Sequence, residues 1–223
     1  MRATRDLLRR RLHFVRRRGN LLAHIQNTHH QYNLPTPQAK IAYKSNRPGV
    51  AEAFADLDVR KSLEIDFAMI ERYDQIIGEL ELHLTRRAKQ HDPHAFHRLR
   101  SIPGVGKVLA LTILYEIHNI DRFPRVQDFA SYCRLVKCQS SSAGKIKGTS
   151  GAKMGNAHLK WAFFEAAVLF LAKCPEGKKL ADRLAKRHGK GKALSIVAHR
   201  IGRAVYFMLK RKRAFDLARF LKA

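Results

Sequence analysis

The chain has 223 residues, of which 44 are Lys or Arg and 18 are Asp or Glu, so its formal net charge is +26 at pH 7. Hydrophobic residues make up 45% of it, which excludes a disordered tail, and no apolar run reaches the roughly 18 residues of a membrane span or forms the core of a secretory signal. A polyanion would neutralise this charge, so we expect a cytoplasmic, nucleoid-associated protein whose partner is nucleic acid, ahead of an anionic membrane or a polyphosphate.

The first predicted element is a helix from Arg5 to about His30, within residues 1–49, which carry a net charge of +10. Its apolar side holds Leu8, Leu12, Val15 and Leu22. The remaining surface is crowded with arginine: Arg9, Arg10, Arg11, Arg16, Arg17 and Arg18. This cluster suits either an acidic partner helix or a nucleic acid, and the sequence favours neither.

A second long helix is predicted from about Val59 to Arg87, after a proline-containing connection over Asn33–Val50. Residues 50–92 have a net charge of −4. The apolar residues follow the alternating four-three spacing of a coiled-coil seam, with Asp66 at the one polar position. They are Val59, Leu63, Ile70, Tyr73, Ile77, Leu80 and Leu84. The helix can lie on its own domain or pair with another helix. Pairing with the first helix gives an antiparallel hairpin, and we therefore predict a helical hairpin or coiled-coil region over residues 1–92.

The next motif is a tight turn, Ile102-Pro103-Gly104-Val105-Gly106-Lys107, between two helical segments. Proline ends the incoming helix, glycines permit positive φ, and an apolar helix restarts over Val108–Ile117. This is the pattern of a helix-hairpin-helix motif. The free amides of its second helix suit a DNA backbone phosphate, so Gly104, Val105, Gly106 and Lys107 are predicted DNA contacts.

The rest of the chain also predicts helices and no strand, which makes the fold class all-α. The predicted helices are Val126–Cys133, Ala157–Lys173, Lys178–His188 and Ala193–Lys212. Trp161 and Phe163 are expected in the core. Together with the turn, these helices form a predicted domain over residues 93–223, and residues 133–223 alone have a net charge of +18.

A loop rich in Ser, Gly and Lys is predicted over Lys137–Asn156. A flexible cationic loop can hold a serine hydroxyl beside a phosphodiester, but the composition alone favours a plain phosphate-binding loop over catalysis. The predicted phosphate contacts are Lys145, Lys147, Lys153 and Lys160. A further basic stretch could also contact phosphate, but a run of charge is more often ordinary solvated surface, which the sequence favours here: Arg200, Arg203, Lys210, Arg211, Lys212 and Arg213.

No metal site is predicted. Cys133, Cys138 and Cys174 have spacings that match no zinc motif, and no nearby histidine completes a ligand set. We expect reduced thiols.

The order of several motifs resembles the C-terminal domain of the RNA-guided serine transposases of bacterial insertion sequences, also called bridge-RNA recombinases. The matching segments are Ser101–Gly106, Asp121–Phe123, Phe129–Ala130, Ser142–Lys145, Lys153–Asn156 and Leu159. The resemblance implies a serine nucleophile at Ser142, with Ser141 as the fallback. It also implies DNA strand exchange, a structured guide RNA that selects the sites, and association of transposase chains or a homo-oligomer.

The same family places Mg²⁺ in an N-terminal RuvC-like domain with four acidic residues in DEDD order. No segment of this sequence resembles that domain, so we expect no bound cofactor and DNA binding without self-sufficient catalysis. A non-catalytic RNA- or DNA-binding helical protein is the alternative. A third possibility is a scaffold that pairs through residues 59–87.

Overall fold

A computed structural model describes residues 2–143, 145–151 and 154–222. For residues 137–142 and 146–151 it describes the backbone alone. The chain divides into two compact units, Arg2–Leu84 and the part from Thr85 onward. Within the described residues, no helix combines the length and apolar character needed to cross a bilayer.

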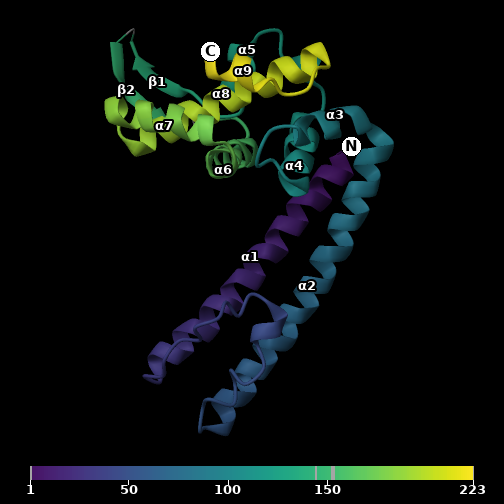
Figure 1. Cartoon of the computed structure of the whole chain (residues 1–223), viewed down its shortest axis with the longest axis vertical. Coiled ribbons are helices and arrows are strands. Elements are labelled where there is room, and N and C mark those ends of the chain that lie inside the picture. The colour runs from purple at the N-terminus through teal and green to yellow at the C-terminus, as the bar shows by residue number, and fades with distance from the viewer. Residues whose placement is uncertain (1, 144, 152–153, 223) are drawn as a thin grey trace. The chain divides into compact units, whose positions relative to one another are not determined.

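The first unit is an antiparallel hairpin of two long helices, α1 (Arg2–Gln31) and α2 (Leu57–His91), of which α2 continues into the second unit (Figure 1). Ion pairs fix the antiparallel register, because partners that advance along α1 retreat along α2. They join Arg11 to Glu81 at 2.5 Å, Arg18 to Asp74 at 2.5 Å and His24 to Asp66 at 2.6 Å. The predicted helical hairpin is therefore confirmed, and a coiled-coil supercoil stays a prediction.

The hairpin core lies at the end where the connection folds back between the helices. Ile25 of α1 and Leu63 and Ile70 of α2 are fully buried there, together with Phe54 of the connection. A short 3-10 helix, η1 (Lys44–Asn46), lies within the connection. Asp66, the polar member of the predicted seam, pairs across the hairpin with His24. A polar seam residue with a cross-hairpin partner favours one register over others.

The second unit is built around three packed helices, α4 (Lys107–Ile117), α6 (Ala157–Lys173) and α8 (Lys190–Arg211). The predicted apolar face of α6 is buried: Leu159, Ala162, Phe163, Ala166, Ala167 and Phe170. Trp161 contradicts its predicted core position, because its side chain is 39% exposed. It lies on the side of α6 away from that face. The shorter elements are α3 (Pro93–Arg100), η2 (Ile120–Arg122), α5 (Val126–Tyr132), α7 (Pro175–His188) and α9 (Leu217–Lys222).

One segment differs from the sequence prediction. The expected loop over residues 137–156 contains two short antiparallel strands, β1 (Lys137–Ser142) and β2 (Lys145–Gly151), which we call the serine hairpin. Its register pairs Ser142 with Lys145 and shifts between Ser140 and Ser141. A strand is predicted from sequence by alternating apolar residues, which this polar run lacks. The pair is instead recognised by the antiparallel pairing of its backbone. The all-α class is otherwise confirmed.

Candidate nucleic-acid interface

The α3–α4 turn is held by close packing against α6. Ile102 and Val105 are buried, and the Val105 amide donates to the carbonyl of Ile102 at 3.0 Å. Gly104 has φ +83°, and a Cβ placed there would lie 2.5 Å from the carbonyl carbon of Leu169 and 2.7 Å from the amide nitrogen of Phe170. Only glycine fits this position without displacing backbone. Gly104 and Val105 therefore hold the turn in place.

The exposed part of the turn is the beginning of α4. Gly106 is the N-cap residue, with no side-chain hydrogen bond to the first turn, and a Cβ at Gly106 would meet nothing within 4 Å. Gly106 and Lys107 are both exposed. Backbone N–H groups at an uncapped helix start attract anions through hydrogen bonding and the helix dipole. The structure thus separates the predicted contacts into an inward pair and an outward pair.

The serine hairpin places Ser141 and Ser142 at the end of β1, next to the turn into β2. Ala143 follows with φ +52°, a left-handed conformation that glycine adopts at lower cost. Lys145 begins β2 and is exposed, as is Lys160 on α6. The side chains of Ser141, Ser142 and Lys147 lie outside the described part, and Lys153 lies outside the described residues altogether.

The exit of the serine hairpin is anchored by Asn156. Its Oδ1 accepts from the amides of His158 at 2.9 Å and Leu159 at 3.0 Å, which caps α6. Its Nδ2 donates to Oε2 of Glu116 at 2.7 Å, and its own amide donates to the carbonyl of Tyr132 at 2.7 Å. Asn156 thereby ties the hairpin exit to α4 and α5.

Sequence reasoning gave no role to Glu116 or Asn156. Glu116 is 1% exposed although it lies in an otherwise apolar helix. A buried carboxylate needs a hydrogen-bond donor. The single acidic residue in the apolar run Val108–Ile117 was therefore the sequence feature that could have indicated a buried, hydrogen-bonded Glu116. Gly155, the residue before Asn156, has φ +102°, and a Cβ there would lie 2.5 Å from the carbonyl oxygen of Tyr132.

The arginines of α1 divide into two groups. Arg11 and Arg18 form the ion pairs of the helical hairpin, while Arg16 and Arg17 are exposed. Arg18 shares Asp74 with Arg47, whose Nη2 lies 2.7 Å from the second carboxylate oxygen. The helix-pairing interpretation therefore accounts for part of the cluster, and exposed cations are left for another partner.

The two cysteines whose side chains are described are buried in the second unit. Cys133 and Cys174 are free and buried, and desolvation raises the pKa of the Cys133 thiol far above its ordinary value. Cys174 also accepts a hydrogen bond from the amide of Gly177 at the start of α7. Across residues 2–143, 145–151 and 154–222, no three His, Cys, Asp or Glu side chains gather as metal ligands would.

Comparison with known proteins finds a family model that matches one region of the chain. Residues 96–182 match the family described as "Transposase IS116/IS110/IS902 family". The chain is 24% identical over 216 residues to "Transposase for insertion sequence element IS1111A" of Coxiella burnetii, covering 94% of this chain and 59% of that protein. It is 33% identical over 85 residues to "Insertion element IS110 uncharacterized 43.6 kDa protein" of Streptomyces coelicolor, covering 38% of this chain and 21% of that protein. The chain thus spans about three fifths of the first relative and one fifth of the second.

Proposed function

We propose, on the premise that residues 96–182 are a region of the IS116/IS110/IS902 transposase family, that this chain acts in DNA transposition as a nucleic-acid-binding portion of a transposase. One observation carries the proposal: the matched region contains both the α3–α4 turn and the serine hairpin. Both segments have exposed cations or uncapped amides that suit phosphate. The net charge of +18 over residues 133–223 supports the same partner.

The proposed backbone contacts are the amides around Gly106 together with lysine side chains. Lys107, Lys145 and Lys160 are exposed and can each neutralise a phosphate. Lys147 and Lys153 are proposed from the sequence alone. Contacts of this kind position DNA without reading its bases. Site selection is therefore assigned to a structured guide RNA, as the resemblance implies, in an assembly of several transposase chains.

The proposed chemistry uses Ser142. A bond forms between its Oγ and the phosphorus of a DNA phosphodiester, and the bond from phosphorus to the neighbouring sugar oxygen breaks. The serine proton passes to that departing oxygen. The phosphodiester is thereby exchanged for a serine–DNA phosphoester, which a second DNA end can reverse. A serine hydroxyl is a weak nucleophile and requires activation.

Magnesium would supply activation in the family that the motifs resemble. The described residues of this chain gather no set of acidic ligands, so they do not fit a Mg²⁺ site. We therefore propose that residues 1–223 bind DNA but do not cleave it unaided.

The first test measures DNA binding by the purified chain at several salt concentrations. A triple variant, Lys107→Gln with Lys145→Gln and Lys160→Gln, should reduce the slope of log K against log salt by about 0.9 for each lost phosphate contact. The matched control replaces three exposed lysines of α7 and α8, Lys178, Lys179 and Lys192, by glutamine. Equal slopes for the two triple variants would contradict the assigned interface. Absence of DNA binding at low ionic strength would overturn the proposed function.

The second test concerns Ser142. Ser142→Ala should leave DNA binding unchanged. When a RuvC-like four-acid domain is supplied in trans, the unsubstituted chain should form a covalent protein–DNA adduct and the variant should not. If neither the unsubstituted chain nor Ser142→Ala forms an adduct in that mixture, the non-catalytic nucleic-acid-binding protein is favoured. An adduct formed by both would contradict the assignment of Ser142 and point to another nucleophile, such as Ser141. Cleavage of a DNA junction by residues 1–223 with Mg²⁺ and no added protein would contradict the proposed dependence on another domain.

A further inference from the structure

A concave pocket of about 610 Å³ lies between α8, α9 and the segment that joins them. We call it the α8–α9 pocket. Its volume is within the roughly 300–1,000 Å³ range of sites that take small organic groups. Five arginines line it: Arg200, Arg203, Arg211, Arg213 and Arg219. The pocket belongs wholly to the second unit, outside the family-matched residues 96–182.

Positive charge dominates this pocket. The one carboxylate among its described lining residues is Asp216, and its Oδ1 accepts from the amide of Arg219 at 3.0 Å. Lys210, from the same basic stretch, does not line the pocket and is paired with Asp121 at 2.8 Å. Burial, together with the charges of Arg203 and Arg200, lowers the pKa of the lining residue His199. The pocket therefore holds a positive potential that its own acid does not cancel.

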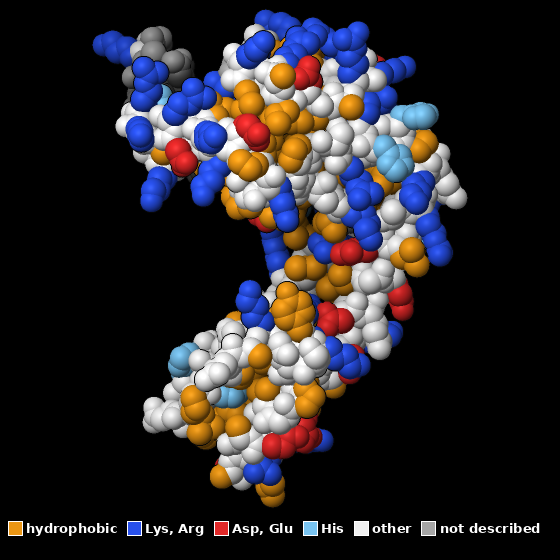
Figure 2. Space-filling model, in the orientation of Figure 1, with side chains coloured by type: hydrophobic (Ala, Val, Ile, Leu, Met, Phe, Trp, Pro, Cys, Tyr) orange, Lys and Arg blue, Asp and Glu red, His pale blue; other side chains and the backbone are white. Residues whose placement is uncertain are grey.

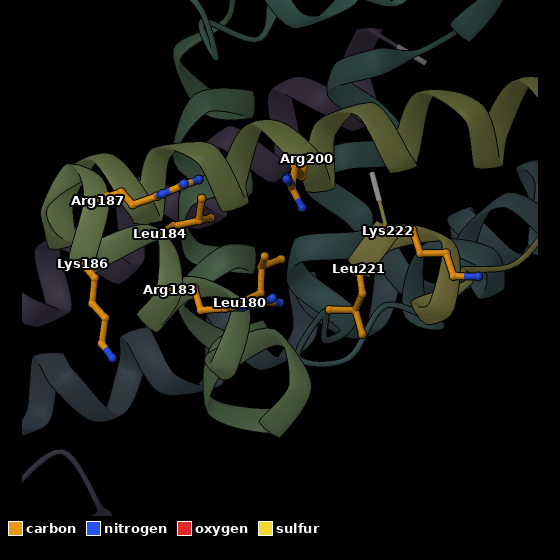
Figure 3. A pocket seen from close by; sticks show the side chains of 8 residues that line it. All are labelled: Leu180, Arg183, Leu184, Lys186, Arg187, Arg200, Leu221 and Lys222. Carbon is orange, nitrogen blue, oxygen red and sulfur yellow. The ribbon is translucent and has the colours of Figure 1, made fainter.

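Arg200 is the most informative of these residues. Its Nη1 is buried and has no hydrogen-bond partner in the described part of the chain. It also lines a neighbouring pocket of about 490 Å³ with Arg183 and Arg187, where Figure 3 shows it pointing from its helix toward the space above Leu180 and Leu221. A buried guanidinium N–H without an acceptor is unfavourable, so the Arg200 side chain gains a hydrogen bond if it turns toward a bound phosphate oxygen.

The lysines and arginines of this region form a broad surface. Figure 2 shows them crowded over α7 and around α8 and α9. On α8, Arg200, Arg203 and Arg211 have helical spacings that place them on one face together with Phe207. A nucleic-acid backbone with regularly spaced phosphates can follow this face of α8.

Apolar and aromatic side chains form the other wall of the α8–α9 pocket. Phe207 is half-buried, and the guanidinium carbon of Arg211 lies 4.8 Å from the centre of its ring. Phe215 lines the pocket nearby and packs against Phe220 with ring centres 5.4 Å apart. Aromatic rings and planar guanidinium groups are the surfaces on which nucleic-acid bases stack.

We propose that the α8–α9 pocket binds an unpaired nucleotide of a single-stranded nucleic acid, with its base against Phe207 and its flanking phosphates on Arg200, Arg203 and Arg213. This inference rests on the proposed nucleic-acid-binding function. A duplex keeps its bases stacked inside, where a concave aromatic wall does not reach them, so the pocket favours a single strand or an extruded base. DNA and RNA share this chemistry, and the experiment separates them.

The test measures binding of the full chain to fluorescent dT12, rU12 and a 12-base-pair duplex by anisotropy. Phe207→Leu keeps an apolar side chain but removes the ring, and it should weaken single-strand binding by about 5- to 150-fold with an unchanged salt slope. Arg203→Gln with Arg213→Gln should reduce the single-strand salt slope by about 1.4. Both arginines are exposed, so this variant tests the pocket even where Phe207→Leu fails to fold. Tighter binding of dT12 identifies the ligand as DNA, and tighter binding of rU12 identifies it as RNA. Equal binding supports recognition of features that both nucleic acids share.

The matched control is Lys178→Gln with Lys179→Gln, two exposed lysines of α7 outside the pocket. The pocket inference fails if the arginine pair and this lysine pair lower the slope equally. It also fails if folded Phe207→Leu binds single strands as tightly as the unsubstituted chain does. It fails likewise if Phe207→Leu weakens duplex binding as much as single-strand binding. These results would leave the proposed function intact. If the unsubstituted chain binds none of the three probes at low ionic strength, the proposed function itself fails.

Discussion

Gly104→Ala should destabilise the unit from Thr85 onward, because the added methyl group has no space in the α3–α4 turn. At φ +83°, a non-glycine residue is strained by about 1–2 kcal/mol. The methyl group would also lie 2.5 Å from the backbone of Leu169, and overpacking of this kind typically costs about 1–3 kcal/mol. Alanine also lowers the conformational entropy of the unfolded chain, which stabilises the folded state by about 0.4–1 kcal/mol. The expected net loss is therefore about 1–5 kcal/mol.

Gly106→Ala is the control, two residues along the same turn. Gly106 has φ −79°, and a Cβ there would meet nothing within 4 Å. Alanine is a poorer N-cap than glycine, but its smaller unfolded-state entropy offsets that loss, so we expect a change within about 0.5 kcal/mol.

Urea denaturation followed by Trp161 fluorescence measures both variants, since Trp161 is the single tryptophan and lies in this unit. With a slope of about 1–3 kcal/mol per molar urea, Gly104→Ala should lower the midpoint by on the order of 1 M. Equal midpoints for the two variants would refute the assignment of Gly104 to packing against α6. DNA binding by folded Gly106→Ala should persist, because the substitution leaves the amides of α4 in place.

Three further predictions concern groups buried or paired elsewhere. Asn156→Ala should cost about 1–3 kcal/mol in urea denaturation, because it removes the cap of α6 and a hydrogen-bond donor to buried Glu116; an unchanged midpoint would contradict the anchoring role. Burial raises the pKa of Asp74, but hydrogen bonds and charges of Arg47 and Arg18 outweigh it and hold that pKa below 3.8. Its stabilisation of the helical hairpin should therefore be complete above about pH 4 and be lost as the pH falls through the lowered pKa, and thermal melts between pH 7 and 3 should show a smaller pH dependence for Asp74→Asn. Cys133, buried and with a raised pKa, should react with iodoacetamide at pH 8 only as the unit unfolds, and rapid labelling in the folded chain would disprove its burial.

Periodicity predicted the helices well because their burial follows the same period. The seam residues Leu63, Ile70 and Leu84 are fully buried in α2, and the predicted face of α6 is buried throughout. The serine hairpin was missed because backbone pairing of a polar run leaves no apolar alternation to detect. Trp161 was misplaced because an apolar helix offers more candidates than its buried face can hold. Long amphipathic elements are thus predictable where short polar ones are not.

The candidate interface was only partly predictable, because sequence does not say which side of a turn faces inward. Gly104 and Gly106 look equivalent in the motif, yet the first packs against the backbone of α6 and the second is exposed. Asn156 and Glu116 are far apart in the chain, and their hydrogen bond follows from the packing of α4 beside the start of α6. Contacts of this kind depend on the tertiary fold, which local patterns do not encode.

Arginines that look alike in the sequence also have different surroundings in the folded chain. Arg11, Arg18 and Arg47 are held by carboxylates within the helical hairpin, and each therefore offers little to a polyanion. Arg200 has a buried nitrogen without an acceptor, in a pocket whose one described carboxylate already caps α9. Replacing a carboxylate partner of Arg11, Arg18 or Arg47 destabilises the folded helical hairpin. A phosphate bound to Arg200 instead adds hydrogen bonds that the folded chain lacks. The net charge of +26 is therefore a poor guide to where nucleic acid binds, and the pairing state of each arginine is a better one.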